Sequence, residues 1–172
     1  MERTLIVLKP DAVQRGLVGE IITRFEKVGL KIVAMKMIKP DEEHYHEHYE
    51  EISKLISRRG KEVFDVNLDF MMDGPVVAVV LEGLGAVDLV RKMVGETEPA
   101  SAAPGTIRGD YSHVSFKHAN AIGSGIPNIV HASGEVAEAE QEVKLWFNDD
   151  ELYSYAAAHE RHTQPTEPQK KQ

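Results

Sequence analysis

The stretch Pro75-Val-Val-Ala-Val-Val-Leu81 predicts the centre of the fold. It is an unbroken run of apolar, mostly β-branched residues, with Gly74 in front of it and the glycines Gly83 and Gly85 behind it. A short apolar run between turn signals is typical of a strand buried inside a sheet. We therefore expect residues 75–81 to form a central strand, with the neighbouring elements packed around it.

The chain in front of this strand predicts two strands and two helices. Residues 4–9 and 30–38 are short, branched apolar runs, which indicate buried strands. Between them, apolar residues recur with helical spacing over 18–28 and predict an amphipathic helix. A second, half-exposed helix is expected over 41–56, whereas the segment 57–73 shows no clear period.

The chain behind the central strand repeats the alternation of helix and strand. Residues 87–94 predict a helix, and 111–116 are the candidate fourth strand. A last helix is expected to begin near Ser133, with Val136, Ala139, Val143 and Trp146 on one face. The order is then β-α-β-β-α-β. It predicts a ferredoxin-like α+β sandwich, in which helices pack on one face of an antiparallel sheet.

Length and composition fit one domain. The 172 residues are 42% hydrophobic and 28% charged, which suffices for a single core of ordinary size. We expect this domain to cover residues 1–160. From Arg161 onward Gln, Pro, Thr, Glu and Lys dominate, so we expect residues 161–172 to be a polar, disordered tail.

Composition also excludes several function classes. The chain has no cysteine, and so has no disulfide framework, thiolate zinc site or cysteine nucleophile. No apolar run is long enough for a secretory signal or a membrane span, which predicts a cytoplasmic protein without a membrane partner. A net charge of -8 argues against nucleic acid as a partner.

The segment Asn128-Ile-Val-His131-Ala-Ser133-Gly134-Glu135 carries the strongest chemical signal. Ser133 is a good helix N-cap, and the first amides of the helix behind it would favour an anion near His131. An imidazole that is largely neutral at pH 7 can attack phosphorus, so His131 is a candidate phosphoryl carrier. A structural, hydrogen-bonded histidine at a strand-to-helix turn explains the segment equally well.

Six motifs together settle that choice, because in this order they resemble one enzyme family. They are Lys9-Pro-Asp-Ala-Val-Gln-Arg-Gly16, Gly74-Pro-Val-Val77, Gly95-Glu-Thr97, Pro104-Gly-Thr-Ile-Arg-Gly-Asp110, Asn128-Ile-Val-His131-Ala-Ser133 and Leu145-Trp-Phe147. The chain closely resembles nucleoside diphosphate kinase from Arg3 to about Tyr155. The resemblance implies transfer of the γ-phosphoryl group of a nucleoside triphosphate to a nucleoside diphosphate, by a ping-pong mechanism through a phosphohistidine at His131.

The resemblance also assigns roles to other residues. Lys9, Arg91 and Arg108 match phosphate-binding cations, and Thr97 and Asn128 match polar ligands of the phosphate and sugar. Three further residues match groups that support the catalytic imidazole: Tyr49, Ser133 and Glu142. For Glu142 this proximity rests on the family alone, because from a helix start at Ser133 it lies more than two turns along.

Cofactor and assembly follow from the same resemblance. Mg²⁺ is implied as the partner of the nucleotide phosphates, with no protein metal ligand and with Asp110 as a possible outer contact. Family members are homo-oligomers, either hexamers or tetramers. The alternative is a catalytically inactive nucleotide-binding module on the same scaffold.

Two segments depart from the family pattern. The connection from Tyr49 to Gly74 is long, and the position expected to stack on the base falls on Val63, with Phe64 next to it. A second insertion, about 113–127, would enter the site from the side and cover either the nucleotide or an oligomer contact. The base contact is therefore not assigned.

Rival motifs are weaker. Gly83-Leu-Gly85-Ala-Val-Asp88 lacks the third glycine of a dinucleotide fingerprint, and the chain has no P-loop. His44, His46 and His48 could suggest a metal site, but no third ligand is evident, so we expect them to be solvated.

Overall fold

Four antiparallel strands form the sheet of the computed structural model, which describes residues 1–163. The strand order is β2-β3-β1-β4, and every neighbouring pair is antiparallel. β3 (Val76–Gly83) and β1 (Glu2–Leu8) are the inner strands, paired from Glu2 opposite Gly83 to Leu8 opposite Val77. β2 (Lys31–Ile38) and β4 (Val130–Ala132) form the edges. The predicted central strand and the ferredoxin-like α+β order are confirmed.

The remaining elements are helical. In chain order they are α1 (Pro10–Gln14), α2 (Val18–Lys27), α3 (Glu42–His46), the π-helical turn η1 (Glu47–Ile52), α4 (Leu55–Arg59), α5 (Lys61–Met72), α6 (Ala86–Val94), the 3₁₀ turn η2 (Pro99–Ser101), α7 (Ile107–Tyr111), α8 (Phe116–Ala121), α9 (Val136–Trp146), the 3₁₀ turn η3 (Asp149–Glu151) and α10 (Glu160–Thr163).

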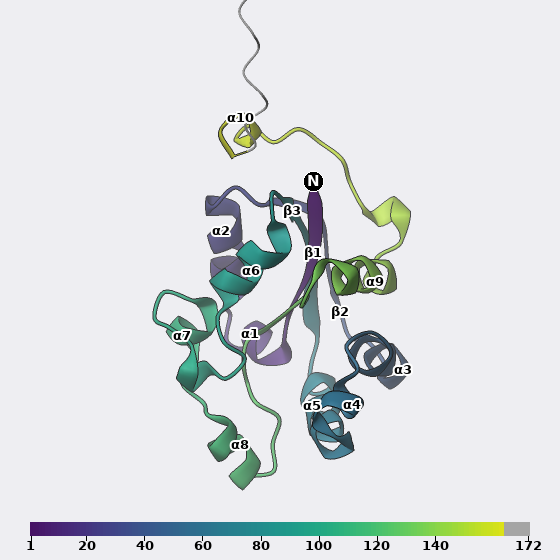
Figure 1. The fold of residues 1–172 in the computed structure, drawn as a ribbon, viewed down its shortest axis with the longest axis vertical. Coiled ribbons are helices and arrows are strands. Elements are labelled where there is room, and N and C mark those ends of the chain that lie inside the picture. Colours follow the sequence, from purple (N-terminus) through teal and green to yellow (C-terminus); the bar gives the residue numbers. More distant parts are fainter. Residues whose placement is uncertain (164–172) are drawn as a thin grey trace, which may run out of the picture.

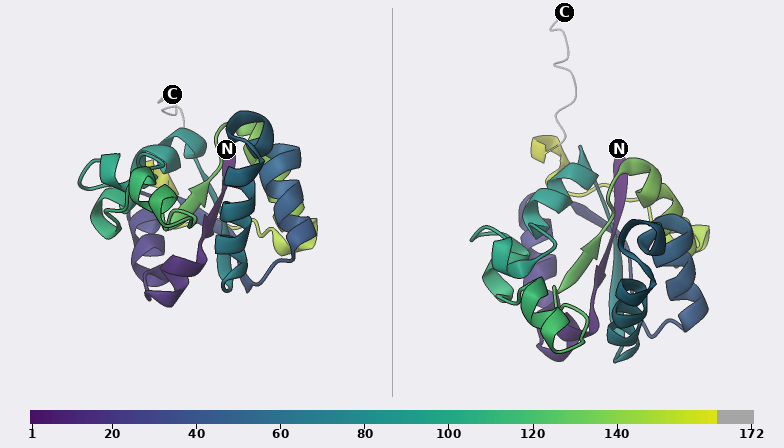
Figure 2. Two further views of the ribbon diagram at one scale, coloured as in Figure 1. Left: turned by 90° about the horizontal axis from the view of Figure 1, so that it is seen from below. Right: turned by 60° about the horizontal axis from the view of Figure 1, so that its bottom comes forward.

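Helices cover both faces of the sheet, so the prediction of one covered face is wrong. Figure 1 shows α2 and α6 on one side of the sheet and α9, α3, α4 and α5 on the other, and Figure 2 shows the same arrangement from two further directions. Along β3, Val77, Val79 and Leu81 belong to one core, whereas Val76 and Val80 belong to the other. A strand that is apolar at every position presents apolar side chains on both faces of the sheet, and both faces must be buried.

The predicted fourth strand over 111–116 is also wrong. Tyr111 ends α7, and Phe116 begins α8, with an extended link between them. Each helix has an N-cap hydroxyl: Thr106 accepts from the Gly109 amide, and Ser115 accepts from the His118 amide. These two local caps outweigh the strand-like pattern, and the fourth strand is instead the three-residue β4 around His131.

The C-terminal segment of the described chain runs back along the start of β2. The Tyr153 amide donates to the Val33 carbonyl at 2.9 Å. The buried Lys31 ammonium contacts the Tyr155 carbonyl and the Glu82 and Glu160 carboxylates, each at 2.9 Å. The predicted tail starts at Arg161, but Arg161–Thr163 belong to α10. Residues 164–172 lie outside the described part.

None of the helices described in residues 1–163 combines the length and the apolar character needed to cross a bilayer.

Replacing Lys31 by Ala should release this C-terminal segment. Hydrogen bonds to charged groups contribute about 1.5–3 kcal/mol, so amide exchange at Tyr153 should accelerate by about tenfold or more. Hydrogen–deuterium exchange followed by mass spectrometry measures it. Lys61→Ala, which breaks the exposed Lys61–Asp65 pair, is the control and should leave this exchange unchanged. Equal protection of Tyr153 in both variants would contradict the anchoring by Lys31.

Candidate active site

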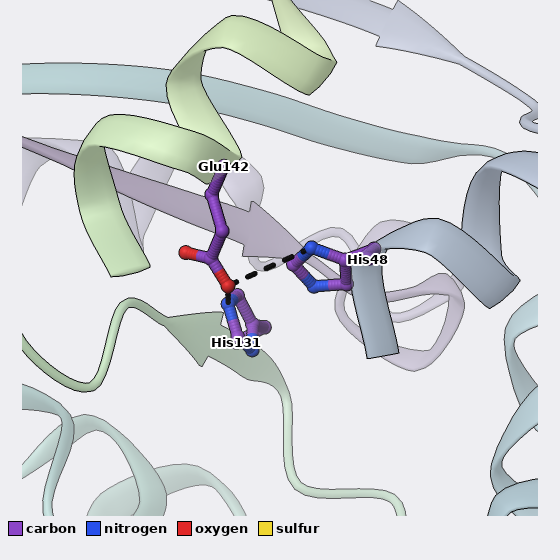
Figure 3. Close-up of side chains that lie close together, drawn as sticks. All are labelled: His48, His131 and Glu142. Carbon is purple, nitrogen blue, oxygen red and sulfur yellow. Dashed lines mark hydrogen bonds and ion pairs between the residues drawn. The ribbon is translucent and has the colours of Figure 1, made fainter. Parts of the chain in front are cut away.

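His131 is positioned by the pairing of β4 with β1. It stands opposite Val7, so its side chain lies on the face of the sheet that α9 covers. The imidazole is 16% exposed, and its Nε2 lies 2.8 Å from Oε1 of Glu142 (Figure 3). The ring is therefore held from one side and still reaches solvent.

Glu142 is a fully buried carboxylate on α9. Its second oxygen accepts the Ser133 hydroxyl. Burial alone would raise its pKa, but the charge and hydrogen bond of His131, followed by His48 and Ser133, lower the pKa to about 2. An ionised carboxylate only accepts hydrogen bonds, so neutral His131 donates from Nε2 and keeps the lone pair of Nδ1 free.

Ser133 does not cap a helix. α9 begins at Val136, and Ser133 is buried at the end of β4, where the Leu5 amide donates to its hydroxyl oxygen at 3.1 Å. The predicted N-cap is thus wrong, and the anion site expected at the first helical amides stays a prediction. The Gly134 amide is already bonded to the Glu138 carboxylate. The serine instead ties Glu142 to β1.

A strained turn precedes the histidine. Ile129 has φ +73°, and the Val130 amide donates back to the Asn128 carbonyl at 2.8 Å, which closes a three-residue γ-turn. A positive φ is costly for a β-branched residue and persists only where neighbours enforce it. Here the Asp11 carboxylate accepts the Ile129 amide and the Lys9 amide donates to the Ile129 carbonyl. The turn thereby fixes α1 against β4.

Arg108 holds the same turn from the other side. Its guanidinium donates to the carbonyls of Asn128, Val130 and Gly95 at 3.1, 2.6 and 3.0 Å. Burial and, next, the nearby charge of Arg91 lower its pKa to about 10, so it stays charged at neutral pH. Two of its five N–H groups remain for a further acceptor.

Lys9 is a buried cation without an ion pair. Among the described residues no hydrogen bond or salt bridge is found for its ammonium, which lies 5.8 Å from the centre of the Phe70 ring. Burial and, next, the charge of Arg108 lower its pKa to about 8, against the opposing charge of Asp11. Arg91 is exposed at the end of α6. These three cations form no salt bridge within the described residues, although Asp11 lies near Lys9 and both Glu96 and Asp11 lie near Arg108.

The remaining predicted residues are brought to the same place. Asn128 is buried, donates to the Thr97 carbonyl at 3.0 Å, and leaves its side-chain oxygen without a partner in the described chain. The Thr97 side chain itself is exposed. The Tyr49 ring is perpendicular to His131, 6.2 Å away, and burial raises its pKa. Asn128 thus connects to the Thr97 backbone and Tyr49 packs beside His131, whereas the roles of the nine predicted residues stay predictions.

His48 was missed by sequence reasoning, and its predicted solvation is wrong. It is fully buried, its ring centre is 4.4 Å from that of His131, and its Nδ1 accepts from Trp146 at 3.2 Å. His44 is also partly buried, and only His46 of the three is exposed. A signal existed, because Tyr45, His48, Tyr49 and Ile52 follow helical spacing and predict one buried face.

The two inserted segments meet beside the site. A side chain at Gly125 would lie 2.6 Å from Cβ of Phe70 on α5, so the 113–127 excursion packs tightly on that helix. Of the two candidates for a base contact, Phe64 is buried in the core and Val63 is 46% exposed. Asp110 pairs with Arg24 and caps the Gly105 amide, so both of its oxygens are engaged.

One group of side chains in the described chain could hold a metal ion. His48, His131 and Glu142 offer ligand atoms within 4.8 Å of one another (Figure 3). Two imidazoles and one carboxylate suit Zn²⁺ better than Mg²⁺, which prefers oxygen ligands. The same atoms are already engaged in the bonds to Trp146 and between His131 and Glu142. The group is therefore a hydrogen-bonded network around His131.

Comparisons with known proteins agree with one another. A family model described as nucleoside diphosphate kinase matches residues 2–152. A nucleoside diphosphate kinase from Pyrococcus furiosus is 51% identical over 158 residues, 92% of this chain and 90% of that protein. A transition state mimic of the Borrelia burgdorferi enzyme with bound vanadate and ADP superposes with a TM-score of 0.89 at 43% identity, covering 92% of this chain and 94% of that one.

A third relative has a different nucleotide bound. The structure of a halophilic nucleoside diphosphate kinase from Halobacterium salinarum in complex with CDP has a TM-score of 0.79 at 41% identity. The match covers 93% of this chain and 96% of the halophilic enzyme. All of these matches span almost the whole described domain.

The free energy of unfolding should depend on pH through Glu142. The pKa of Glu142 is about 2 in the folded protein, against the ordinary glutamate value of 4.5 in the unfolded chain. The ionised carboxylate therefore stabilises the fold above pH 4.5, and this contribution is lost as the pH falls toward 2. The shift corresponds to the order of 3 kcal/mol. Chemical denaturation at pH 5 and pH 2 measures the loss. Glu142→Gln should lack this loss, whereas Glu140→Gln, exposed on the same helix, should keep it. An equal loss in Glu142→Gln and the wild type would contradict the assignment.

Proposed function

The chain belongs to the nucleoside diphosphate kinase family, and on this premise we propose that His131 is its phosphoryl carrier. The protein is a nucleoside diphosphate kinase, which moves the γ-phosphoryl group from a nucleoside triphosphate to a nucleoside diphosphate. The single observation that supports His131 most directly is its hydrogen bond to the ionised Glu142, which assigns the ring proton of a neutral imidazole to Nε2 and leaves Nδ1 unprotonated.

The reaction proceeds in two halves. In the first, the Nδ1 lone pair forms a bond to the γ-phosphorus while the bond from that phosphorus to the β-phosphate oxygen breaks, so the diphosphate leaves. In the second, a terminal phosphate oxygen of the acceptor diphosphate attacks the phosphohistidine and Nδ1 leaves. Glu142 stabilises the positive charge that develops on the imidazole of His131.

The cations bind the phosphates. Lys9, Arg91 and Arg108 offset the charge of the transferring group, and Thr97 and Asn128 bind phosphate and sugar. Burial strengthens this attraction, because Lys9 and Arg108 are poorly solvated and have no carboxylate ion pair in the described chain. The unpartnered oxygen of Asn128 is suited to accept from a sugar hydroxyl.

The base has few specific contacts. Val63, rather than the buried Phe64, is the side chain available to an aromatic base. An aliphatic contact does not read a hydrogen-bonding edge, so we expect broad base tolerance. The relatives that bind ADP and CDP support this expectation.

A nucleotide kinase of this family uses a divalent metal, which we propose to be Mg²⁺. The site fits an ion carried by the nucleotide, because its side chains are cations and amides rather than a carboxylate cage. When bound, Mg²⁺ neutralises charge on the phosphate oxygens. Lys9 and Arg108 would hold the phosphates that carry it.

Assembly and location are inferred from the family. We propose a homo-oligomer, hexameric or tetrameric, in the cytoplasm. The inactive module loses its support, because every predicted catalytic and supporting residue is present and the described insertions leave His131 accessible.

His131→Ala should abolish the phosphoenzyme. Wild-type protein incubated with γ-labelled ATP and Mg²⁺ should acquire an acid-labile, alkali-stable label that a nucleoside diphosphate discharges. His118→Ala, which alters an exposed histidine on α8, is the control and should label normally. Label at the wild-type level in His131→Ala would show that another residue is the carrier.

The protonation of Lys9 should determine how kcat/KM falls at alkaline pH. Its pKa of about 8 in the free protein means that the cation is present below pH 8 and lost above it. We expect kcat/KM to fall about tenfold per pH unit at high pH, since this parameter reports the free enzyme. Lys9→Arg should lower kcat/KM and flatten the profile, and Lys92→Met, on the exposed end of α6, should leave the profile unchanged. A wild-type profile flat from pH 7 to 10 would contradict this.

A further inference from the structure

We propose that His48 is a positioning residue that selects Nδ1 of His131 as the phosphorylated atom. The inference rests on the proposed role of His131 as carrier. His48 does not face solvent and is not assigned to the nucleotide. Its function would be to fix the orientation of the neighbouring imidazole and to reserve the Glu142 carboxylate for it.

The π-helical turn η1 places His48 against the site. His48 and Tyr49 are adjacent in sequence, yet both rings contact His131, at 4.4 and 6.2 Å between centres and nearly perpendicular to it. π-turns inside helices are frequent at functional sites. The Lys54 residue that follows the turn has φ +53°, a second local departure from regular helix. The turn thereby places two aromatic rings, those of His48 and Tyr49, against one side of His131.

The protonation of His48 is fixed by its partner. Trp146 Nε1 can only donate, and it lies 3.2 Å from His48 Nδ1, so Nδ1 is the acceptor and the ring proton sits on Nε2. Burial and, next, the adjacent His131 keep the pKa of His48 well below its usual value, against the attraction of Glu142. His48 is therefore neutral at working pH.

Because His48 is neutral, the Glu142 carboxylate is available to accept a hydrogen bond from His131. Glu142 Oε1 is 3.6 Å from His48 Nδ1 and 2.8 Å from His131 Nε2 (Figure 3). Without a proton on Nδ1, His48 cannot compete for this oxygen, so His131 is its donor. A flipped His131 would bond Glu142 through Nδ1 and expose Nε2. The His48 ring lies 4.4 Å from His131 and opposes that rearrangement.

The test reads which nitrogen carries the phosphate. Wild type, His48→Ala, His48→Phe and His48→Asn are labelled with ATP and Mg²⁺, quenched in alkali within seconds, and analysed by ³¹P NMR for the Nδ1 and Nε2 isomers. His48→Phe keeps a ring without the acceptor, and His48→Asn keeps an acceptor for Trp146 without the ring. His46→Ala, on the adjoining turn of helix and exposed, is the control.

We expect only the Nδ1 isomer in wild type and in His46→Ala. His48→Ala should give both isomers and a kcat at least tenfold lower, with KM for the nucleotide changed less than threefold. His48→Phe and His48→Asn should each restore part of the selectivity. A folding defect alone would lower the amount of active protein and leave the isomer ratio unchanged, so circular dichroism and active-site titration accompany the measurement.

Two failures are distinguishable. If wild-type protein forms no phosphohistidine, or if His131→Ala still forms it, the proposed carrier is wrong. If wild type forms the Nδ1 isomer at His131 and all three His48 variants form it exclusively at the wild-type rate, the carrier stands and the positioning role of His48 is overturned.

Discussion

The buried charge of Glu142 is the constraint on which the site depends. A carboxylate removed from water must be paired, and a broken buried pair is strongly destabilising. Of its partners, His131 lies in β4 and Ser133 directly follows that strand, and the Leu5 amide of β1 in turn donates to the Ser133 hydroxyl. The same contact that fixes the imidazole therefore joins α9 to the sheet. Misplacing His131 would leave a buried charge unpaired, so stability and catalytic geometry are maintained together.

The cations have a comparable double role. Arg108 donates to three backbone carbonyls around the γ-turn at Ile129. The backbone amide of Lys9 and the carboxylate of Asp11 hold the same turn through hydrogen bonds to Ile129. The groups that would meet the phosphates are thus connected, within a few bonds, to the backbone of the histidine. This rigidity matters because electrostatic stabilisation of a transition state requires donors that are already in place before the reaction.

Sequence patterns predicted the inner strands, because β-branched runs such as 75–81 need no tertiary knowledge. They failed where a strand is too short to show its period, where helix caps override a strand-like pattern, and where the deciding contact is distant in sequence. β4 has three residues, too few to show a period of two, and the strand-like pattern at 111–116 yields to the caps Thr106 and Ser115. The residues of the proposed nucleotide site were assigned through family motifs, and their roles stay predictions. Glu142 and His48 could not be placed from spacing, since α9 and η1 meet at His131 only in the folded chain.

An acidic protein can bind polyanions where the carboxylates nearest the proposed site are paired or buried. The net charge is -8, yet Asp110 is paired with Arg24 and Glu142 with His131, and the pKa of Asp11 is raised by burial. At 0.15 M salt, charges farther away than about 8 Å are largely screened. Phosphates bound as proposed would interact mainly with Lys9, Arg91 and Arg108, and the attraction is strongest at the buried Lys9 and Arg108. Asp11 lies beside Lys9 and supports its charge, and the same carboxylate holds the Ile129 amide, so removing it to increase the positive field would release the turn that positions His131.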